Sequence, residues 1–150
     1  MPPHCDRRHT TPPEEAAYLA GLIDGDGHIG LHKRPTTHSV TGYRFQADVE
    51  TAGVDAESVA EIRGLVKSGC WKTTCRGFKS SRPVHRLSFT ADTLRWLLPL
   101  LIPHLKLKKE QALAVIESLG LVKKGRHGHN PRSDELYMRL KRLNRRGANP

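Results

Sequence analysis

Two acidic side chains stand between glycines in the segment Leu19–Gly27, which reads LAGLIDGDG. Asp24 and Asp26 are two positions apart, so they would not share one face of a helix. We therefore expect one of them to be structural and the other functional. Gly25 and Gly27 let the chain turn sharply and present Asp26 at the end of a helix. The chemistry that this segment could supply is that of a carboxylate presented at the end of a helix.

A helix must position these acids. Residues 11–14 (Thr-Pro-Pro-Glu) read as a capping box with proline where no N–H donor is needed. We therefore predict a helix from about residue 12 to residue 24, ended by Gly25 and Gly27. Small residues on this helix let another helix backbone approach closely, at Ala17, Ala20 and Gly21.

Strand pairs and helices alternate along the rest of the core. Apolar and polar residues alternate over 28–32, 44–49, 71–76 and 84–89, which predicts four strands. Helical spacing predicts a helix over 55–67 and helical structure over 92–117, interrupted near Pro99 and Pro103 and ended by Gly120. A last helix is predicted with Ser133 as its cap and one apolar face of Leu136, Leu140 and Leu143. The order αββαββα predicts an α+β fold whose antiparallel sheet has one face on helices and one in water.

The water-facing side of that sheet is expected to be basic, since residues 70–90 contain five bases and no acid. Such a face is suited to a DNA major groove, which accepts a β-ribbon. An ordinary solvated face is the equal alternative. Strand alternation places on this side His32, Arg34, Arg44, Gln46, Asp48, Lys72, Thr74, Arg76 and Arg86.

The chain has 150 residues, which fits one domain, and a formal net charge of +10. Residues 1–27 hold two bases and five acids, whereas residues 120–150 hold nine bases and two acids. A balance this basic favours a polyanionic partner, most often nucleic acid. No apolar run is long enough to span a membrane, no signal peptide is visible and the three cysteines indicate reduced thiols. We therefore expect an intracellular protein that is not secreted.

The nine residues LAGLIDGDG resemble the motif of the LAGLIDADG homing endonucleases in eight of nine positions, and Gly25 for Ala is a common form in that family. The order αββαββα over residues 11–117 and the basic segment Leu105–Ala112 resemble the same family. The resemblance implies a curved antiparallel sheet that forms a saddle for DNA. It covers about two thirds of the chain and gives an endonuclease core at 11–119. Outside the resemblance, residues 1–10 show no periodicity and are expected to be a disordered tail, and residues 120–150 are expected to form a basic loop and helix.

The resemblance also implies the site. Asp26 and the carbonyl of Gly25 would bind Mg²⁺, with Mn²⁺ or Ca²⁺ as substitutes, and no small-molecule cofactor is expected. Lys108 would place positive charge near the scissile phosphate, the alternative being a surface lysine. Asp24 would be a hydrogen-bonding partner near the helix junction. The expected DNA-binding set is completed by His28 and Arg82.

One motif provides one carboxylate per chain, which is a poor site for phosphodiester hydrolysis. A two-fold dimer packed helix against helix brings two Asp26 side chains together, and the resemblance is to the single-motif homodimeric branch of the family. We expect a homodimer that makes a double-strand break with short 3′ overhangs in a long, nearly palindromic target, as in intron homing. The expected interface residues are Ala17, Ala20, Gly21 and Asp24.

One position departs from the homodimeric relatives. They carry a glutamine near the end of the second strand, whereas the residues here are Asp48, Val49, Glu50 and Thr51. This indicates a different water network or reduced activity, with Glu50 as an extra metal ligand as an alternative. It also leaves open a second function, in which the chain binds DNA or RNA without cleaving it, as an intron maturase or a transcription regulator does.

Two further patterns were open to a functional interpretation. Cys70 and Cys75, with His85 downstream, raise the question of zinc, but strand alternation puts the two cysteines on opposite faces and disfavours joint ligation. The basic clusters Lys123–Arg126 and Arg139–Arg146 are expected to contact backbone phosphates, or to form a solvated face.

Overall fold

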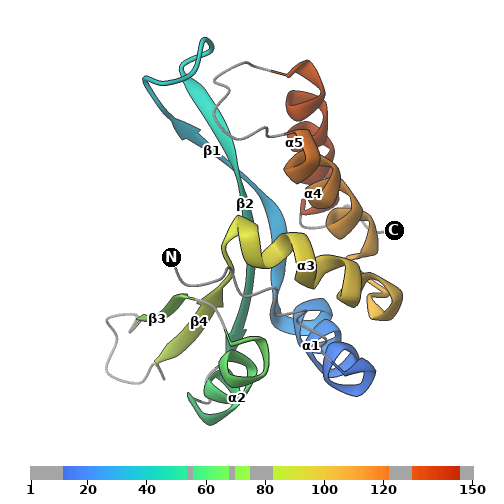
Figure 1. Cartoon of the computed structure of the whole chain (residues 1–150). Coiled ribbons are helices and arrows are strands. Elements are labelled where there is room, and N and C mark those ends of the chain that lie inside the picture. The colour runs from blue at the N-terminus through green and yellow to red at the C-terminus, as the bar shows by residue number, and fades with distance from the viewer. Residues whose placement is uncertain (1–11, 54–55, 68–69, 75–82, 122–129, 146–150) are drawn as a thin grey trace, which may run out of the picture.

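Two β-hairpins form one antiparallel sheet in the computed structural model, which describes residues 12–53, 56–67, 70–74, 83–121 and 130–145. The strand order is β1-β2-β4-β3. The α+β fold with the predicted αββαββα core is confirmed. The elements (Figure 1) are α1 (Pro13–Asp26), β1 (His28–Pro35), β2 (Tyr43–Gly53), α2 (Ala56–Val66), β3 (Cys70–Thr74), β4 (Val84–Ser88), α3 (Ala91–Leu101), a 3₁₀ turn η1 (Ile102–His104), α4 (Lys109–Leu121) and α5 (Pro131–Leu143).

The strand register gathers apolar side chains on the sheet face against which the helices pack. Ile29 pairs with Val49, and Thr51 pairs with Leu87. All four side chains are buried. Because side chains alternate along a strand, the residues between them lie on the opposite face. The sheet therefore has one covered face and one polar face, as the sequence pattern predicts.

Two helices supply much of the core. α3 buries Leu94, Leu97, Leu98 and Leu101, while α1, which packs on α3 and on β2, buries Ala16, Leu19, Ala20 and Ile23. The predicted break near Pro103 is present as η1. The predicted break at Pro99 is wrong, since this residue lies inside α3.

Other predicted helix ends are wrong for local reasons. α1 runs through Gly25 to Asp26, and Gly27 alone ends it, with its N–H bonded to the carbonyl of Ile23. α4 continues past Gly120 to Leu121. Asn130, not Ser133, caps α5, because its side-chain oxygen accepts from the N–H of Arg132. Asparagine is as good a cap as serine, so sequence preference alone could not choose between them.

The long β1–β2 hairpin is held by α5, beside which it runs in Figure 1. The ring of Tyr137 stacks on Phe45 with centroids 4.9 Å apart. The hydroxyl of Tyr43 donates to Asp134 at 2.7 Å, and this bond raises the pKa of Tyr43. Of the predicted apolar face of α5, Leu136 and Leu140 are buried, whereas Leu143 is only partly covered.

Some predictions lie outside the described residues: the tail at 1–10, Thr11 of the capping box, Cys75, Arg76, Arg82 and the cluster Lys123–Arg126. Among the helices that the structure describes, none combines the length and apolar character needed to cross a membrane.

Candidate functional site

The end of α1 is held against the sheet by close packing at Gly27. A Cβ atom placed there would lie 2.6 Å from the Cα atom of Ile23 and 2.8 Å from the carbonyl oxygen of Glu50. Because both neighbours are backbone atoms, this position requires glycine. Asp26 directly precedes it, and both Asp26 and Gly25 are exposed. The motif therefore presents these two residues to solvent where α1 meets β2.

Asp24 lies at the same helix end but contacts the chain before α4. Its carboxylate accepts hydrogen bonds from three consecutive backbone N–H groups, those of Lys106 (2.7 Å), Leu107 (3.3 Å) and Lys108 (3.0 Å). The structure therefore places Asp24 at the helix junction as a hydrogen-bonding residue. Its carboxylate is thus engaged within its own chain, and its part in a dimer contact stays a prediction.

Lys108 makes the reverse contact, in which its side chain binds the backbone of α1. Its Nζ atom donates to the carbonyl oxygens of Ile23 at 2.8 Å and Asp24 at 2.7 Å. The last carbonyls of a helix carry partial negative charge, which favours a cation there. We call this set of contacts, between residues 23–24 and residues 106–108, the helix-end clamp.

The clamp brings the two predicted catalytic side chains near each other. Burial lowers the pKa of Lys108, and the carboxylates of Asp24 and Asp26 oppose that shift. The ammonium group binds the carbonyl of Asp24, two residues before Asp26 in the same helix end. The expectation that Lys108 places positive charge near a scissile phosphate stays a prediction.

The possible metal ligands at this helix end fit a hard divalent cation, because they are oxygen atoms and the helix C-terminus favours positive charge. Asp26 offers a carboxylate and Gly25 a main-chain carbonyl. Within the described parts of the chain, no group of three or more His, Cys, Asp or Glu side chains is placed to hold a metal ion.

The polar face of the sheet carries the predicted DNA-binding residues that the structure describes. The register places His28, His32, Arg34, Arg44, Gln46 and Asp48 on it. Arg86 lies on the same face, since its neighbour Leu87 is buried on the other. Lys72 pairs in register with Arg86, and Thr74 with Val84.

The acids on this face are paired with bases. The Oδ2 atom of Asp48 lies 3.6 Å from Nε2 of His28 and 3.7 Å from Nδ1 of His32. Glu50 accepts a hydrogen bond from Arg86 at 3.1 Å. Gly30 leaves the space that His28 uses, because a Cβ atom there would lie 2.8 Å from the ring Nε2. The Arg86 guanidinium offsets the negative charge that Glu50 would otherwise add to the face.

The end of β2 shows what occupies the region where a glutamine was expected. Val49 and Thr51 are buried on the helix-covered side. Glu50 lies on the polar face beside Gly27, and Arg86 binds its carboxylate. A role for Glu50 as an extra metal ligand would compete with this ion pair.

The outward face of α1 carries small residues beside the exposed ring of Tyr18. Ala17 and Gly21 are exposed, and a Cβ atom added at Gly21 or Gly25 would meet nothing within 4 Å. The prediction for Ala20 is wrong, because its side chain is fully buried in the core of its own chain and offers no surface to a second helix.

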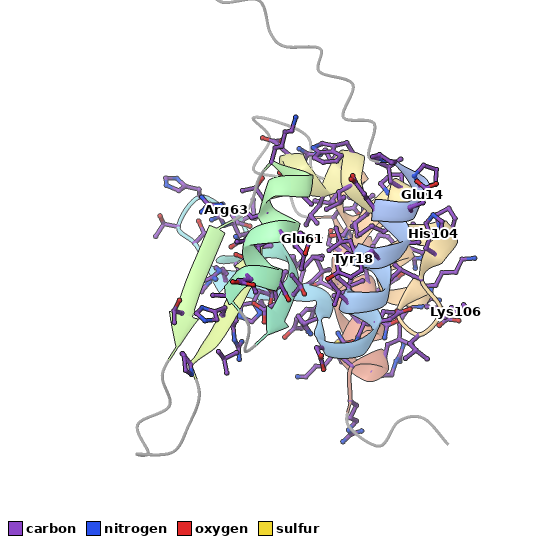
Figure 2. All side chains as sticks on the ribbon, turned by 90° about the horizontal axis from the view of Figure 1, so that it is seen from below. Glu14, Tyr18, Glu61, Arg63, His104 and Lys106 are labelled. Atoms are coloured by element: carbon purple, nitrogen blue, oxygen red, sulfur yellow. The ribbon has the colours of Figure 1, made fainter. Side chains whose placement is uncertain are left out.

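Charged side chains surround that outward face. In Figure 2, Glu14 and Tyr18 project from α1, between α2 on one side and the η1 region on the other. The labelled neighbours on α2 are Glu61 and Arg63, and those near η1 are His104 and Lys106. Both signs of charge therefore occur around the same small-residue surface.

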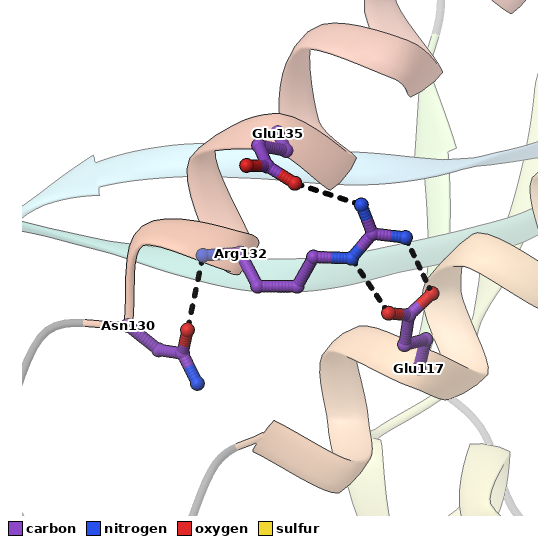
Figure 3. Close-up of polar contacts among 4 residues, drawn as sticks. All are labelled: Glu117, Asn130, Arg132 and Glu135. Carbon is purple, nitrogen blue, oxygen red and sulfur yellow. Dashed lines mark hydrogen bonds and ion pairs between the residues drawn. The ribbon is translucent and has the colours of Figure 1, made fainter.

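A second polar cluster lies between α4 and α5 (Figure 3). The guanidinium of Arg132 donates to both carboxylate oxygens of Glu117, at 2.7 and 3.2 Å, and to Glu135 at 2.7 Å. We call these three residues the Arg132 cluster. The sequence did not predict this cluster, nor that Asp24 binds residues 106–108. Neither contact follows from the spacing of residues within one helix or strand.

Comparisons with known proteins identify structures that share this fold. No protein-family model matches the chain, and no curated protein matches it. Among solved structures, the archaeal intron-encoded homing endonuclease I-Vdi141I, complexed with DNA, has a TM-score of 0.73 and 20% identity over 89% of this chain and 86% of that one. The homing endonuclease I-CvuI, in complex with its target in the presence of calcium, has a TM-score of 0.58 and 18% identity over 87% and 95%.

The LAGLIDADG homing endonuclease I-SmaMI, bound to cleaved DNA, has a TM-score of 0.66 and 20% identity over 89% of this chain but 44% of its own. The present chain thus spans about half of that protein. The fold is that of the LAGLIDADG homing endonucleases, and the motif at Leu19–Gly27 lies at the exposed end of α1 within it.

Proposed function

We propose that the chain is a site-specific DNA endonuclease that uses Mg²⁺. The observation that supports this most is the exposed pair Gly25 and Asp26 beside Lys108, in a fold shared with homing endonucleases. Asp26 and the Gly25 carbonyl hold the cation, for which Mn²⁺ or Ca²⁺ can substitute. A bound cation supplies water activation and stabilisation of the leaving oxygen. The positive charge of Lys108 lies at the same helix end, where its ammonium group binds the carbonyls of Ile23 and Asp24.

The enzyme acts as a homodimer through the outward face of α1. Support comes from the exposed Ala17 and Gly21, and from the single motif, which provides one exposed Asp26 carboxylate per chain. The surrounding charges have both signs, so a two-fold axis allows acids of one copy to face bases of the other. Two Asp26 side chains then lie near the axis. Each protomer cuts one strand of a nearly palindromic duplex, leaving short 3′ overhangs.

The polar face of the sheet reads base edges in the major groove. Its arginines suit guanine and Gln46 suits adenine, because bidentate hydrogen bonds of that kind distinguish these bases. Pairing of Glu50 with Arg86 offsets one acid of this face and keeps it compatible with a polyanion. Binding should weaken steeply with salt, because a chain of charge +10 releases counterions from DNA.

The test begins with a randomised duplex library and Mg²⁺, from which cleaved sites are selected and sequenced. We expect one nearly palindromic site with 3′ overhangs. On that site, Asp26→Asn should retain binding and lose cleavage. Asp92→Asn is a matched control, since this exposed acid on α3 pairs with Arg95 away from the motif, and it should cleave like the wild type. Cleavage by Asp26→Asn would contradict the metal assignment.

A second candidate is a relative that binds DNA or RNA without cleavage, as a maturase or transcription regulator. It is favoured by one observation, the engagement of Glu50 by Arg86 in the region where homodimeric relatives carry glutamine. The same library separates the two, because this candidate enriches bound sequences that remain intact in both Mg²⁺ and Mn²⁺. Sedimentation of the protein on its selected site tests the dimer, and a monomer there would overturn it.

A further inference from the structure

The helix-end clamp fixes the main chain on both sides of the exposed motif residues. Asp24 binds three backbone N–H groups of the segment that precedes α4. Lys108 binds the carbonyls of Ile23 and Asp24. Gly25 and Asp26 follow at once and are themselves followed by Gly27, which is packed on the backbone of β2. The two exposed residues therefore lie between two points at which the backbone cannot move freely.

The ammonium group of Lys108 is committed to α1. Its two hydrogen bonds, at 2.8 and 2.7 Å, are in the short range for a charged donor. They add a charged donor at two of the last carbonyls of α1, of which that of Ile23 also accepts from the N–H of Gly27. Moving the ammonium outward to a phosphate would break both bonds and leave Ile23 with its backbone donor alone.

We infer that Lys108 is a positioning residue, which sets the geometry of the Gly25 carbonyl and the Asp26 carboxylate by holding the end of α1. Asp24 is its counterpart, because its carboxylate fixes the backbone from which the Lys108 side chain extends. This deepens the proposed function and rests on it for the identity of the cation at Asp26. The clamp itself is a property of the free chain.

The first experiment measures amide hydrogen exchange in the free protein, with neither metal nor DNA. Lys108→Met keeps the length and the apolar stem of the side chain but removes both donors. We expect the amides of residues 106–108 and Gly27 to exchange about tenfold faster or more, because each bond lost is a charge-assisted one. Lys109→Met removes a neighbouring exposed lysine outside the clamp and should leave these amides unchanged.

The second experiment measures cleavage of the selected site as a function of Mg²⁺ concentration. A positioning role predicts that Lys108→Met raises the half-saturating Mg²⁺ concentration about 10- to 100-fold, as is typical when a group that orients a metal ligand is removed. The rate at saturating Mg²⁺ should return close to that of the wild type. A lysine that touches the phosphate would instead lower the saturated rate and leave the Mg²⁺ requirement unchanged, and this result would overturn the inference.

A third variant covers the case in which Lys108→Met does not fold. Asp24→Asn keeps the size of the side chain but removes the charge, so it should accelerate exchange at 106–108 and raise the Mg²⁺ requirement in the same direction. Unchanged exchange in Asp24→Asn would overturn the clamp. If the wild type cleaves no duplex, the proposed function fails, and the exchange experiment still decides whether Lys108 holds the end of α1.

Discussion

The helix-end clamp and the Arg132 cluster both join segments that are distant in sequence through charged side chains, yet they differ in what they hold. In the clamp, Asp24 and Lys108 each bind main-chain atoms. In the Arg132 cluster, side chains bind side chains, and all three are well exposed, at 44% for Arg132, 44% for Glu117 and 65% for Glu135.

That difference indicates which of the two sets of contacts makes the fold more rigid. An exposed ion pair between flexible side chains is screened by water and salt and adds little to stability. A carboxylate that satisfies three backbone donors fixes the path of the chain, since its loss leaves those donors without a protein partner. We therefore expect the clamp to control the site, whereas the Arg132 cluster should only adjust the surface of α4 and α5.

The largest effect should follow removal of Asp24. Asp24→Ala deprives three backbone N–H groups of a charged acceptor. We expect the free energy of unfolding to fall by about 1.5–3 kcal/mol, the scale of one hydrogen bond to a charged group, because water can replace the acceptor at the exposed Lys106 and Leu107. Urea denaturation measures this. The control Asp92→Ala removes an exposed acid of an i,i+3 pair and should change little. Equal effects of the two variants would remove the distinction between the regions.

The next effect concerns the packing of the same helix end. Gly27→Ala would put a Cβ atom within 3 Å of the backbone of Ile23 and of Glu50, so we expect a loss of about 1–3 kcal/mol from overpacking. Gly21→Ala meets open space in the single chain and should gain up to about 1 kcal/mol from helix propensity. If the proposed dimer is correct, Gly21→Ala should at the same time weaken association, as measured by sedimentation.

The sequence predicted the elements and the motif well because these depend on local patterns. Alternation in the strands identified the polar face on which His28, His32 and Arg34 lie. It could not identify the clamp, because the contact of Asp24 with residues 106–108 joins positions more than 80 residues apart. It also misplaced Ala20, because a small residue on a helix packs equally well against its own core or a partner.

A smaller loss of stability is expected from the Arg132 cluster. Arg132→Ala removes the hydrogen bonds to Glu117 and Glu135, but the change in unfolding free energy should be less than that of Asp24→Ala and should shrink further in high salt. The Asp24→Ala effect should persist in salt, because it comes from unsatisfied backbone donors. Urea denaturation at low and high salt tests this, and a salt-insensitive Arg132 effect would contradict it.

The smallest effect is a change in titration at Glu117. The hydrogen bond from Arg132 lowers the pKa of Glu117 below its usual value of 4.5, with smaller help from the charge of Arg139. A carboxyl whose pKa is lower in the folded state contributes stability that is present above its unfolded pKa and is lost as the pH falls through the folded pKa. The contribution therefore disappears in acid, below about pH 4.5.

Arg132→Ala should accordingly return the pKa of Glu117 towards its usual value, which NMR titration of the Glu117 side-chain carboxyl can measure. Arg139→Ala is the matched control, because Arg139 acts on Glu117 by charge alone and should produce a smaller rise. Neither variant should alter amide exchange at residues 106–108, since the cluster and the clamp share no residue. If Arg132→Ala did accelerate that exchange, the two regions would be coupled through α4, and the surface cluster would help to position the motif.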